Sequence, residues 1–337
     1  MFNPVADLYR NWRNTIVNAR SFGADPDKVL ERCRAYIRGI KDAAPYMACT
    51  AKHFPGDGQD ELDPHLSLAH NDLGFEEWMA TYGKVYRGLI DDGLEAIMPG
   101  QISLPAASRH YRPGIKDEEI MPATLSPELL RDLLRGELGF NGVLVSDASH
   151  MIGMSGVMKR SEAVPKCFAA GCDMFLFAND MAEDIEFLKQ GIADGIVTEE
   201  CLSDALHRVL GLKAHLGLNE NRRIPEEADL EVIGCEKHHM YAGQAADEGI
   251  TLVKDTRHLL PIDPATHKNA FLIYVQTTPN SKAYQGDPVR TMVTEALEKA
   301  GFNVTQCPNF YDLEVKNGPS PRNMGIMMGH SSRKEFI

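Results

Sequence analysis

Long hydrophobic runs are missing from this sequence. No stretch approaches the ~18 consecutive apolar residues of a membrane-spanning helix. The first seven residues, Met-Phe-Asn-Pro-Val-Ala-Asp, also lack the basic segment and apolar core of a secretory signal peptide. These absences predict a cytoplasmic protein without a membrane span, although a longer parent chain could still carry a signal peptide.

Positive charge is scarce, because the chain has 35 Lys and Arg residues but 48 Asp and Glu residues. The formal net charge of −13 at pH 7 argues against nucleic acid or an anionic membrane as the main partner. Cysteine is limited to seven residues, an odd number scattered mostly inside apolar runs. This pattern is typical of reduced core cysteines rather than of disulfides or a zinc site.

Strand-like and helix-like segments alternate along the first two thirds of the chain. The predicted strands are 46–52, 94–98, 142–146 and 173–177, and the predicted helices are 25–44, 74–91, 127–138, 161–170, 180–193 and 198–216. Nearly continuous apolar strands separated by helices predict a parallel sheet, here a (β/α)8-type TIM barrel. A doubly wound open sheet is the alternative, but the sequence has no Gly-rich phosphate-binding turn.

The composition changes after Gly217. Residues 1–217 are predicted to form the catalytic domain, and the polar residues 218–235 a linker. Residues 236–337 are predicted to form part of a second α/β domain, with a helix at 236–248 and a strand at 271–276. From about residue 316 onward no periodic pattern remains, which predicts a poorly ordered tail.

A long polar loop follows the first predicted strand. The segment Lys-His-Phe-Pro-Gly-Asp-Gly-Gln-Asp-Glu-Leu-Asp-Pro-His covers residues 52–65. Its prolines and glycines rule out regular structure, so the segment is predicted to be a loop. The loop follows the carboxyl end of a strand, and in a barrel that end of the strands carries the active site. A metal site formed by Asp57, Asp60, Asp63 and His65 is an alternative, but its spacing matches no known ligand pattern.

Asp147 directly follows the apolar strand at 142–146. A carboxylate at the end of a buried strand is costly unless it has a function, which makes Asp147 a candidate catalytic residue. A helix-capping role in a loop between strand and helix is the alternative reading.

Together these motifs resemble glycoside hydrolase family 3, in the branch that cleaves β-linked N-acetylhexosaminides. The Lys-His-Phe-Pro-Gly motif and the Asp-x-His motif of residues 52–65 match it, as do Gly-Phe-Asn-Gly-Val-Leu-Val-Ser-Asp-Ala at 139–148 and the flanking segments 122–127 and 134–140. The resemblance extends from about residue 2 to about residue 275. It implies a TIM-barrel catalytic domain and a retaining glycosidase that needs no metal or organic cofactor.

By this resemblance, Asp147 is the nucleophile that forms a covalent glycosyl-enzyme. His65 is the acid/base residue and Asp63 its partner, in place of the second carboxylate that most retaining glycosidases use. An imidazole can give a proton and then take one from water, and a neighbouring carboxylate supports its charged form.

The resemblance also assigns residues that contact the substrate. Lys52 and His53 correspond to contacts with sugar hydroxyl groups, and Arg20, in Ala-Arg-Ser-Phe-Gly, to another substrate contact. Gln101 is a departure, because many relatives have a histidine at the end of this strand. We interpret this change as an effect on fine specificity.

These assignments predict hydrolysis of terminal β-linked N-acetylglucosamine in cell-wall or chitin-derived saccharides, as in peptidoglycan turnover. A first alternative is phosphorolysis, in which phosphate captures the same intermediate on Asp147. A second is a β-glucosidase whose acid is a glutamate of the second domain, which the Asp63-x-His65 motif argues against. A third is a remnant without catalytic activity.

The number of predicted strands is smaller than a complete barrel requires. Four strands and a possible fifth at Pro4–Leu8 compare with eight in a TIM barrel. The resemblance therefore implies a family member that lacks its first strands and part of its second domain. We expect weak activity, or an oligomer in which a partner chain pairs with the open edge.

Overall fold

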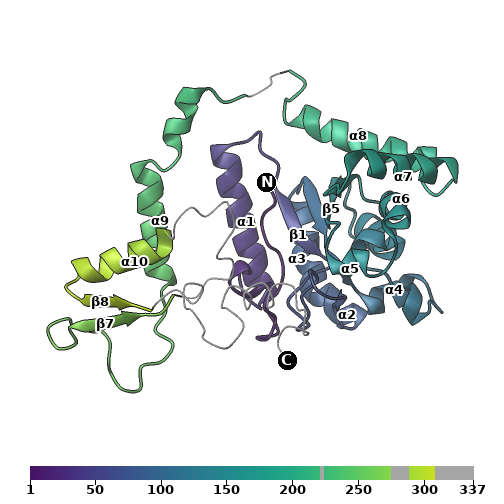
Figure 1. The fold of residues 1–337 in the computed structure, drawn as a ribbon. Helices are drawn as coiled ribbons and strands as arrows, with labels where there is room; N and C mark the ends of the chain where they lie inside the picture. Colours follow the sequence, from purple (N-terminus) through teal and green to yellow (C-terminus); the bar gives the residue numbers. More distant parts are fainter. Residues whose placement is uncertain (221–223, 275–287, 308–337) are drawn as a thin grey trace, which may run out of the picture. The chain divides into compact units, whose positions relative to one another are not determined.

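The computed structural model describes residues 1–220, 224–274 and 288–307 (Figure 1). By its internal contacts the chain divides into two units, Met1–Glu226 and Glu227–Ile337. The finer limits expected from the sequence, 1–217, 218–235 and 236–337, stay a prediction. The predicted tail at 316–337 and the end of the predicted strand, residues 275–276, lie outside the described residues.

Helices and strands alternate through the first unit. Its helices are α1 (Pro26–Ala43), α2 (Phe75–Trp78), α3 (Lys84–Asp91), α4 (Pro105–Tyr111), α5 (Ile152–Ser155), α6 (Arg160–Ala170), α7 (Met181–Ala193) and α8 (Glu199–His215). Its strands are β1 (Thr50–Phe54), β2 (Ala69–His70), β3 (Ala96–Pro99), β4 (Ile102–Ser103), β5 (Val143–Ala148) and β6 (Met174–Leu176). A π-helical turn, Met79–Gly83, joins α2 to α3, and Glu128–Glu137 is also π-helical.

Four parallel strands form the main sheet in the order β1-β3-β5-β6. Val5 forms a parallel bridge with Lys52, and the amide of Ala6 donates to the carbonyl of Lys52 at 2.7 Å, which extends the sheet beyond β1. The strands therefore follow one another in chain order. A doubly wound sheet reverses its order at a switch point, so that alternative is wrong.

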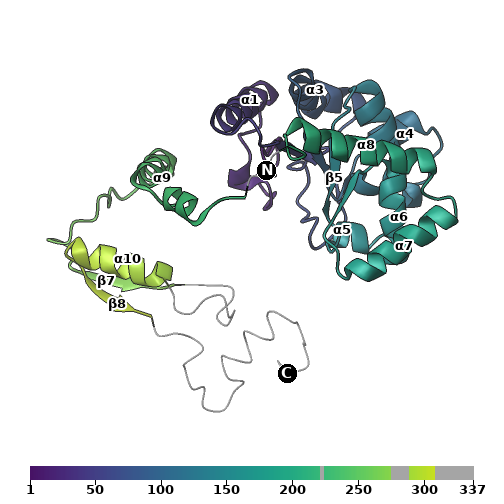
Figure 2. The same cartoon turned by 90° about the horizontal axis from the view of Figure 1, so that it is seen from above.

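Strands in chain order with right-handed crossovers place the connecting helices on one side of the sheet, as in a barrel. Accordingly, α6, α7 and α8 lie on the same side of β5 (Figure 2). The predicted barrel-type fold is confirmed. In the described part of the chain the sheet stays open, because β6 pairs only with β5 and the Val5 segment only with β1.

The helix boundaries follow from local capping. The Asp25 carboxylate accepts hydrogen bonds from the amides of Asp27 and Lys28, and Pro26 occupies the first helical position of α1. Asp180 caps α7 in the same way. These two helix starts were predicted correctly because capping depends on neighbouring residues.

The first strand begins later than the sequence predicted. β1 starts at Thr50 rather than at 46, and Tyr46 and Met47 are exposed, so the apolar run alone overestimated the strand. The strand also ends later, at Phe54 rather than at 52, so His53 as well as Lys52 lies within β1. The short β2–β4 pair was not predicted, because two residues are too few to show a pattern.

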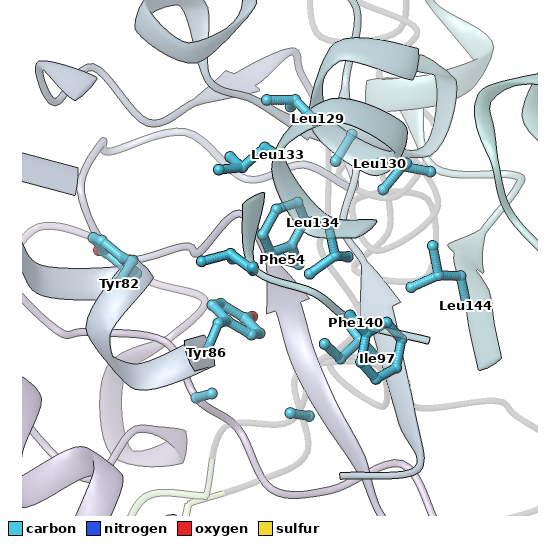
Figure 3. Packing of buried hydrophobic residues seen from close by; sticks show 14 of the residues in the cluster. Phe54, Tyr82, Tyr86, Ile97, Leu129, Leu130, Leu133, Leu134, Phe140 and Leu144 are labelled. Carbon is cyan, nitrogen blue, oxygen red and sulfur yellow. The ribbon is translucent and has the colours of Figure 1, made fainter. Parts of the chain in front are cut away.

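Aromatic residues pack against the end of β1, next to Lys52 and His53. Phe54 is fully buried and meets Trp78 and Tyr86 edge to face, with ring centroids 5.9 and 5.1 Å apart. The buried leucines of the Glu128–Glu137 helix complete this cluster (Figure 3). The cluster fixes the backbone of β1 directly beside Lys52 and His53.

In its described residues, the second unit contains a parallel strand pair. Its elements are α9 (Glu236–Gly249), β7 (Asn269–Leu272), α10 (Pro288–Lys299) and β8 (Asn303–Gln306). Strands β7 and β8 are paired in register from Asn269 with Asn303 to Leu272 with Gln306. This is a parallel pair with an intervening helix, as α/β domains contain.

Two further sequence expectations concern the whole chain. All seven cysteines are free, and Cys33, Cys49, Cys167 and Cys172 are buried as expected, whereas the other three are half-buried. Among the described residues, none of the helices combines the length and the apolar character that crossing a membrane requires.

Candidate active site

Charged side chains meet at the carboxyl ends of β1 and β5. Both strands flank β3 in a parallel sheet, so their ends lie at the same edge. Burial and the positive charge of Arg20 lower the pKa of Lys52, while the negative charge of Asp147 opposes this shift. The charges of Arg20 and Asp147 therefore both act on Lys52.

Asp147 is half-buried at the end of β5. Its Oδ1 accepts a hydrogen bond from the amide of Ala148 at 2.7 Å. The hydroxyl of Ser146 accepts from the amide of Leu176 at 2.8 Å, and the amide of Ser149 donates to the carbonyl of the same residue at 2.7 Å. Hydrogen bonds on both sides of Asp147 thus fix its backbone against β6.

His53 forms a buried pair with Asp7. Its Nδ1 lies 2.8 Å from Oδ2 of Asp7, whose side chain is fully buried. Burial by itself would lower the pKa of His53, but the charge and the hydrogen bond of Asp7 outweigh it, so the pKa of His53 is raised. The pair therefore favours a protonated His53.

Asp7 was missed as a site residue. Its Oδ1 accepts from the amides of His53 at 3.0 Å and Asp57 at 2.8 Å. Burial would raise the pKa of Asp7, but the His53 charge and these hydrogen bonds together hold it below its usual value. The signal in the sequence was a carboxylate inside the apolar segment Val-Ala-Asp-Leu.

Asp63 and His65 form a pair on the loop after β1. Oδ1 of Asp63 accepts from the amide of His65 at 2.9 Å and lies 2.7 Å from its Nδ1. The His65 side chain is 53% exposed, so its ring remains accessible. With Nδ1 facing the carboxylate, Nε2 is the nitrogen available for proton transfer.

The loop that carries this pair is attached to the chain just after Asp147. The amides of Ile152 and Gly153 donate to the carbonyls of His65 and Pro64, at 3.2 and 3.0 Å. The segments of the two predicted catalytic residues are therefore joined by main-chain hydrogen bonds.

Arg20 is exposed and lies after a short segment that Asn14 holds in place. The side-chain oxygen of Asn14 accepts from the amides of Ile16 and Val17. Its Nδ2 donates to Oδ1 of Asp57 at 2.9 Å and to the carbonyl of Asp60 at 3.0 Å. Asn14, a second residue that the sequence did not single out, thus connects the Arg20 segment to the loop after β1.

Gln101 lies just after β3, at the strand end that the sequence indicated. It is 1% exposed, and its Oε1 accepts from the hydroxyl of Thr124. Its Nε2 lies 3.4 and 3.5 Å from the carbonyls of Asp147 and Ala148. Both ends of the amide are thus engaged inside the protein, and an effect of Gln101 on fine specificity stays a prediction.

The acidic loop residues considered as metal ligands bind main-chain amides instead. Asp57 accepts from Gly58, Asp60 from Leu62 and His70, and Asp63 from His65. Within the described residues no group of three or more His, Cys, Asp or Glu could hold a metal ion.

Asp57 is a buried carboxylate with a perturbed pKa. Burial and the negative charge of Asp7 raise the pKa of Asp57 to about 6, although the Gly58 amide and Asn14 oppose the shift. The folded protein therefore holds this proton more tightly than the unfolded chain does. The stabilisation is complete below pH ~4 and is lost as the pH rises through about 6.

Asp57→Asn is expected to remove this pH dependence, because asparagine keeps the Oδ1 acceptor and does not ionise. Between pH 4.5 and 7.5, wild type should lose roughly 2 kcal/mol more unfolding free energy than the variant. Urea unfolding at several pH values measures the difference. The exposed Glu118→Gln variant is the control and should follow wild type. Parallel curves for Asp57→Asn and wild type would show that Asp57 titrates normally.

Comparison with known proteins identifies the family. Residues 1–212 match the glycosyl hydrolase family 3 N terminal domain. The chain is 42% identical over 307 residues to a beta-N-acetylglucosaminidase/beta-glucosidase of Cellulomonas fimi, which covers 90% of this chain and 54% of that protein. It is 35% identical over 188 residues to a beta-hexosaminidase of Tolumonas auensis, covering 56% of this chain and 52% of that protein.

Solved structures agree. The chain superposes on a beta-glucoside phosphorylase, BglX, with a TM-score of 0.83 and 38% identity, covering 94% of this chain and 56% of that one. A family 3 beta-N-acetylglucosaminidase from Paenibacillus gives a TM-score of 0.76 at 23% identity, which shows a shared fold. The chain spans about half the length of the relatives it matches. With residues 1–212 matching the family's N-terminal domain, the chain belongs to glycosyl hydrolase family 3.

Proposed function

We propose that the protein is a retaining glycosidase that removes terminal β-linked N-acetylglucosamine from cell-wall or chitin-derived saccharides. The observation that carries the proposal is the joining of the Asp63–His65 pair to the segment that follows Asp147. The 42% identical relative from Cellulomonas fimi, named for N-acetylglucosaminidase and glucosidase activity, supports the substrate class.

The reaction proceeds in two steps. A carboxylate oxygen of Asp147 attacks the anomeric carbon while Nε2 of the protonated His65 gives its proton to the leaving oxygen, so the glycosidic bond breaks as the ester bond forms. Water then attacks the anomeric carbon and gives a proton to the neutral His65, which regenerates Asp147. Asp63 stabilises the imidazolium and fixes its tautomer, as a triad carboxylate does.

Lys52, His53 and Arg20 hold the sugar in this scheme. Lys52 lies within electrostatic range of both Arg20 and Asp147, and the Lys52 and Arg20 side chains both carry hydrogen-bond donors. His53 is oriented by the buried Asp7 and can donate its other ring N–H to a hydroxyl group.

Phosphorolysis is the second candidate, favoured by the likeness to the beta-glucoside phosphorylase. Phosphate would then replace water in the second step and carry the sugar away as a glycosyl phosphate. A neutral His65 repels an anion less than a carboxylate would, which allows phosphate to approach Asp147. The products of turnover with and without phosphate distinguish the two reactions.

Asp147→Ala is expected to abolish turnover of an aryl N-acetylglucosaminide, because the covalent step then has no nucleophile. Asp72→Ala, a change at an exposed aspartate, should retain activity. A fluorinated N-acetylglucosamine-type inactivator should label the peptide that contains Asp147, as detected by mass spectrometry. Labelling of a glutamate in residues 231–337 would overturn the assignment.

His65→Ala should affect substrates according to their leaving groups. For poor leaving groups, kcat/KM should fall by roughly 10²–10⁴-fold, because the first step then lacks its proton. For an activated aryl substrate, kcat/KM should change little. His70→Ala, at an exposed histidine in β2, is the control. Equal losses on both substrates would mean that His65 acts only by holding the loop.

The open sheet edges are proposed to pair between copies of the chain. Met174 and Phe177 are 39% and 55% exposed at the β6 edge, where unpaired backbone groups can add a strand. Expressed alone, residues 1–337 should be oligomeric by light scattering and weakly active, and Phe177→Lys should shift the mass toward the monomer. A cooperative, monomeric and fully active protein would contradict this and would also exclude an inactive remnant.

A further inference from the structure

Three segments that are distant in the sequence meet at Gly153. A Cβ atom built on Gly153 would lie 2.6 Å from Cβ of Gln101, 2.7 Å from its carbonyl oxygen and 3.2 Å from the carbonyl oxygen of Pro64. Two of these distances are shorter than real side chains tolerate. Position 153 therefore has no room for a side chain between the Gln101 backbone and the loop that carries His65.

The need for glycine here is one of space and not of backbone conformation. Gly153 lies in α5, and it is not among the glycines with a positive φ. Alanine is otherwise the more favourable residue in a helix. The close approach of Gln101 and Pro64 is thus the physical reason for glycine at this position.

Gln101 connects this contact to the nucleophile strand. Its Nε2 faces the carbonyls of Asp147 and Ala148, and its Oε1 is held by Thr124. Gln101 is almost completely buried, so its position is set by the core and not by solvent. One side of Gln101 thus meets the main chain at Asp147 and the other meets Gly153.

On its other side, Gly153 holds the loop of the acid/base residue. Gly153 and Ile152 donate to the carbonyls of Pro64 and His65. In the described part of the structure, the remaining hydrogen bonds of residues 64–67 are all made to Asp63, within the same loop. The His65 and Leu66 side chains are largely exposed and add little packing.

We infer that Gln101 and Gly153 are positioning residues that act as a spacer and set the placement of His65 relative to Asp147. The inference rests on the proposed glycosidase function. The spacer determines how far Nε2 of His65 stands from the leaving oxygen of a sugar bound at Asp147. Proton transfer depends steeply on that distance, and a displacement of about 1 Å can cost 10²-fold in rate.

Gly153→Ala tests the spacer, because it keeps both amide donors and adds only the Cβ that pushes Pro64 and Gln101 apart. We expect kcat/KM for a poor leaving group to fall by roughly 10–100-fold and that for an activated aryl substrate to change less than about threefold. Gly211→Ala in α8 is the matched control, because its Cβ would meet nothing within 4 Å.

A double-mutant cycle with His65→Ala separates positioning from general damage. If Gly153 acts through His65, adding Gly153→Ala to His65→Ala should cause little further loss on the poor substrate. Additive losses, or equal losses on both substrates in the single variant, would overturn the inference.

Hydrogen exchange provides a readout that does not need activity. The amides of Ile152 and Gly153 and those of Leu66 and Ser67 should exchange faster in Gly153→Ala than in wild type, and unchanged in Gly211→Ala. If exchange rises but wild type cleaves no N-acetylglucosaminide, the proposed function fails and the spacer stands. Unchanged exchange at residues 63–68 would overturn the spacer while leaving the function intact.

Discussion

The hydrogen bonds accepted by the buried carboxylate of Asp7 are the interactions on which one side of the candidate site depends. The carboxylate is fully buried and accepts three hydrogen bonds: two from His53, through its amide and its ring, and one from the amide of Asp57. The segment around Val5 that bridges to β1, the end of β1 and the loop beyond it are thereby tied to one carboxylate. Leaving a buried charge without its partner costs about 3–5 kcal/mol, so these segments are held together strongly.

Asp57 shows what this arrangement costs. The Asp57 carboxylate is buried near that of Asp7, and this burial and the repulsion between the two carboxylates raise the pKa of Asp57 to about 6. Hydrogen bonds that Asn14 and Gly58 donate to Asp57 partly offset this shift. Asn14 in turn holds the segment before Arg20. One buried cluster therefore places Arg20 and His53, which come from separate parts of the chain.

The sequence predicted those features that depend on neighbouring residues. The starts of the helices expected at 25–44 and 180–193, the alternation of strands and helices, and the carboxylate Asp147 after an apolar run were all visible in local patterns. The start of β1 was missed, because the apolar residues Tyr46 and Met47 lie in an exposed turn. An apolar run marks burial, and here burial begins at Cys49, directly before the pairing with β3 begins at Thr50.

Contacts between distant segments were beyond such patterns. Asp7 and His53 are 46 residues apart, and Gly153 meets both Gln101 and Pro64 only in the folded chain. A glycine in the sequence indicates flexibility or lack of space equally well, and only the distances to its neighbours decide between them. For the same reason, the position of Gln101 just after a strand does not reveal that its amide is buried against the carbonyls of Asp147 and Ala148.

The use of histidine as the proposed acid/base residue fits the charge around Asp147. A second carboxylate close to Asp147 would need a strongly raised pKa to stay protonated, which burial or repulsion must provide. An imidazole on an exposed loop avoids this requirement, because it carries its proton as a cation and becomes neutral when it gives the proton away. Asp63, His65 and Asp147 all belong to the unit Met1–Glu226. Both proposed steps can therefore proceed without a proton donor from residues 227–337. Their rates then depend on the distance between the loop that carries His65 and the strand β5 that carries Asp147.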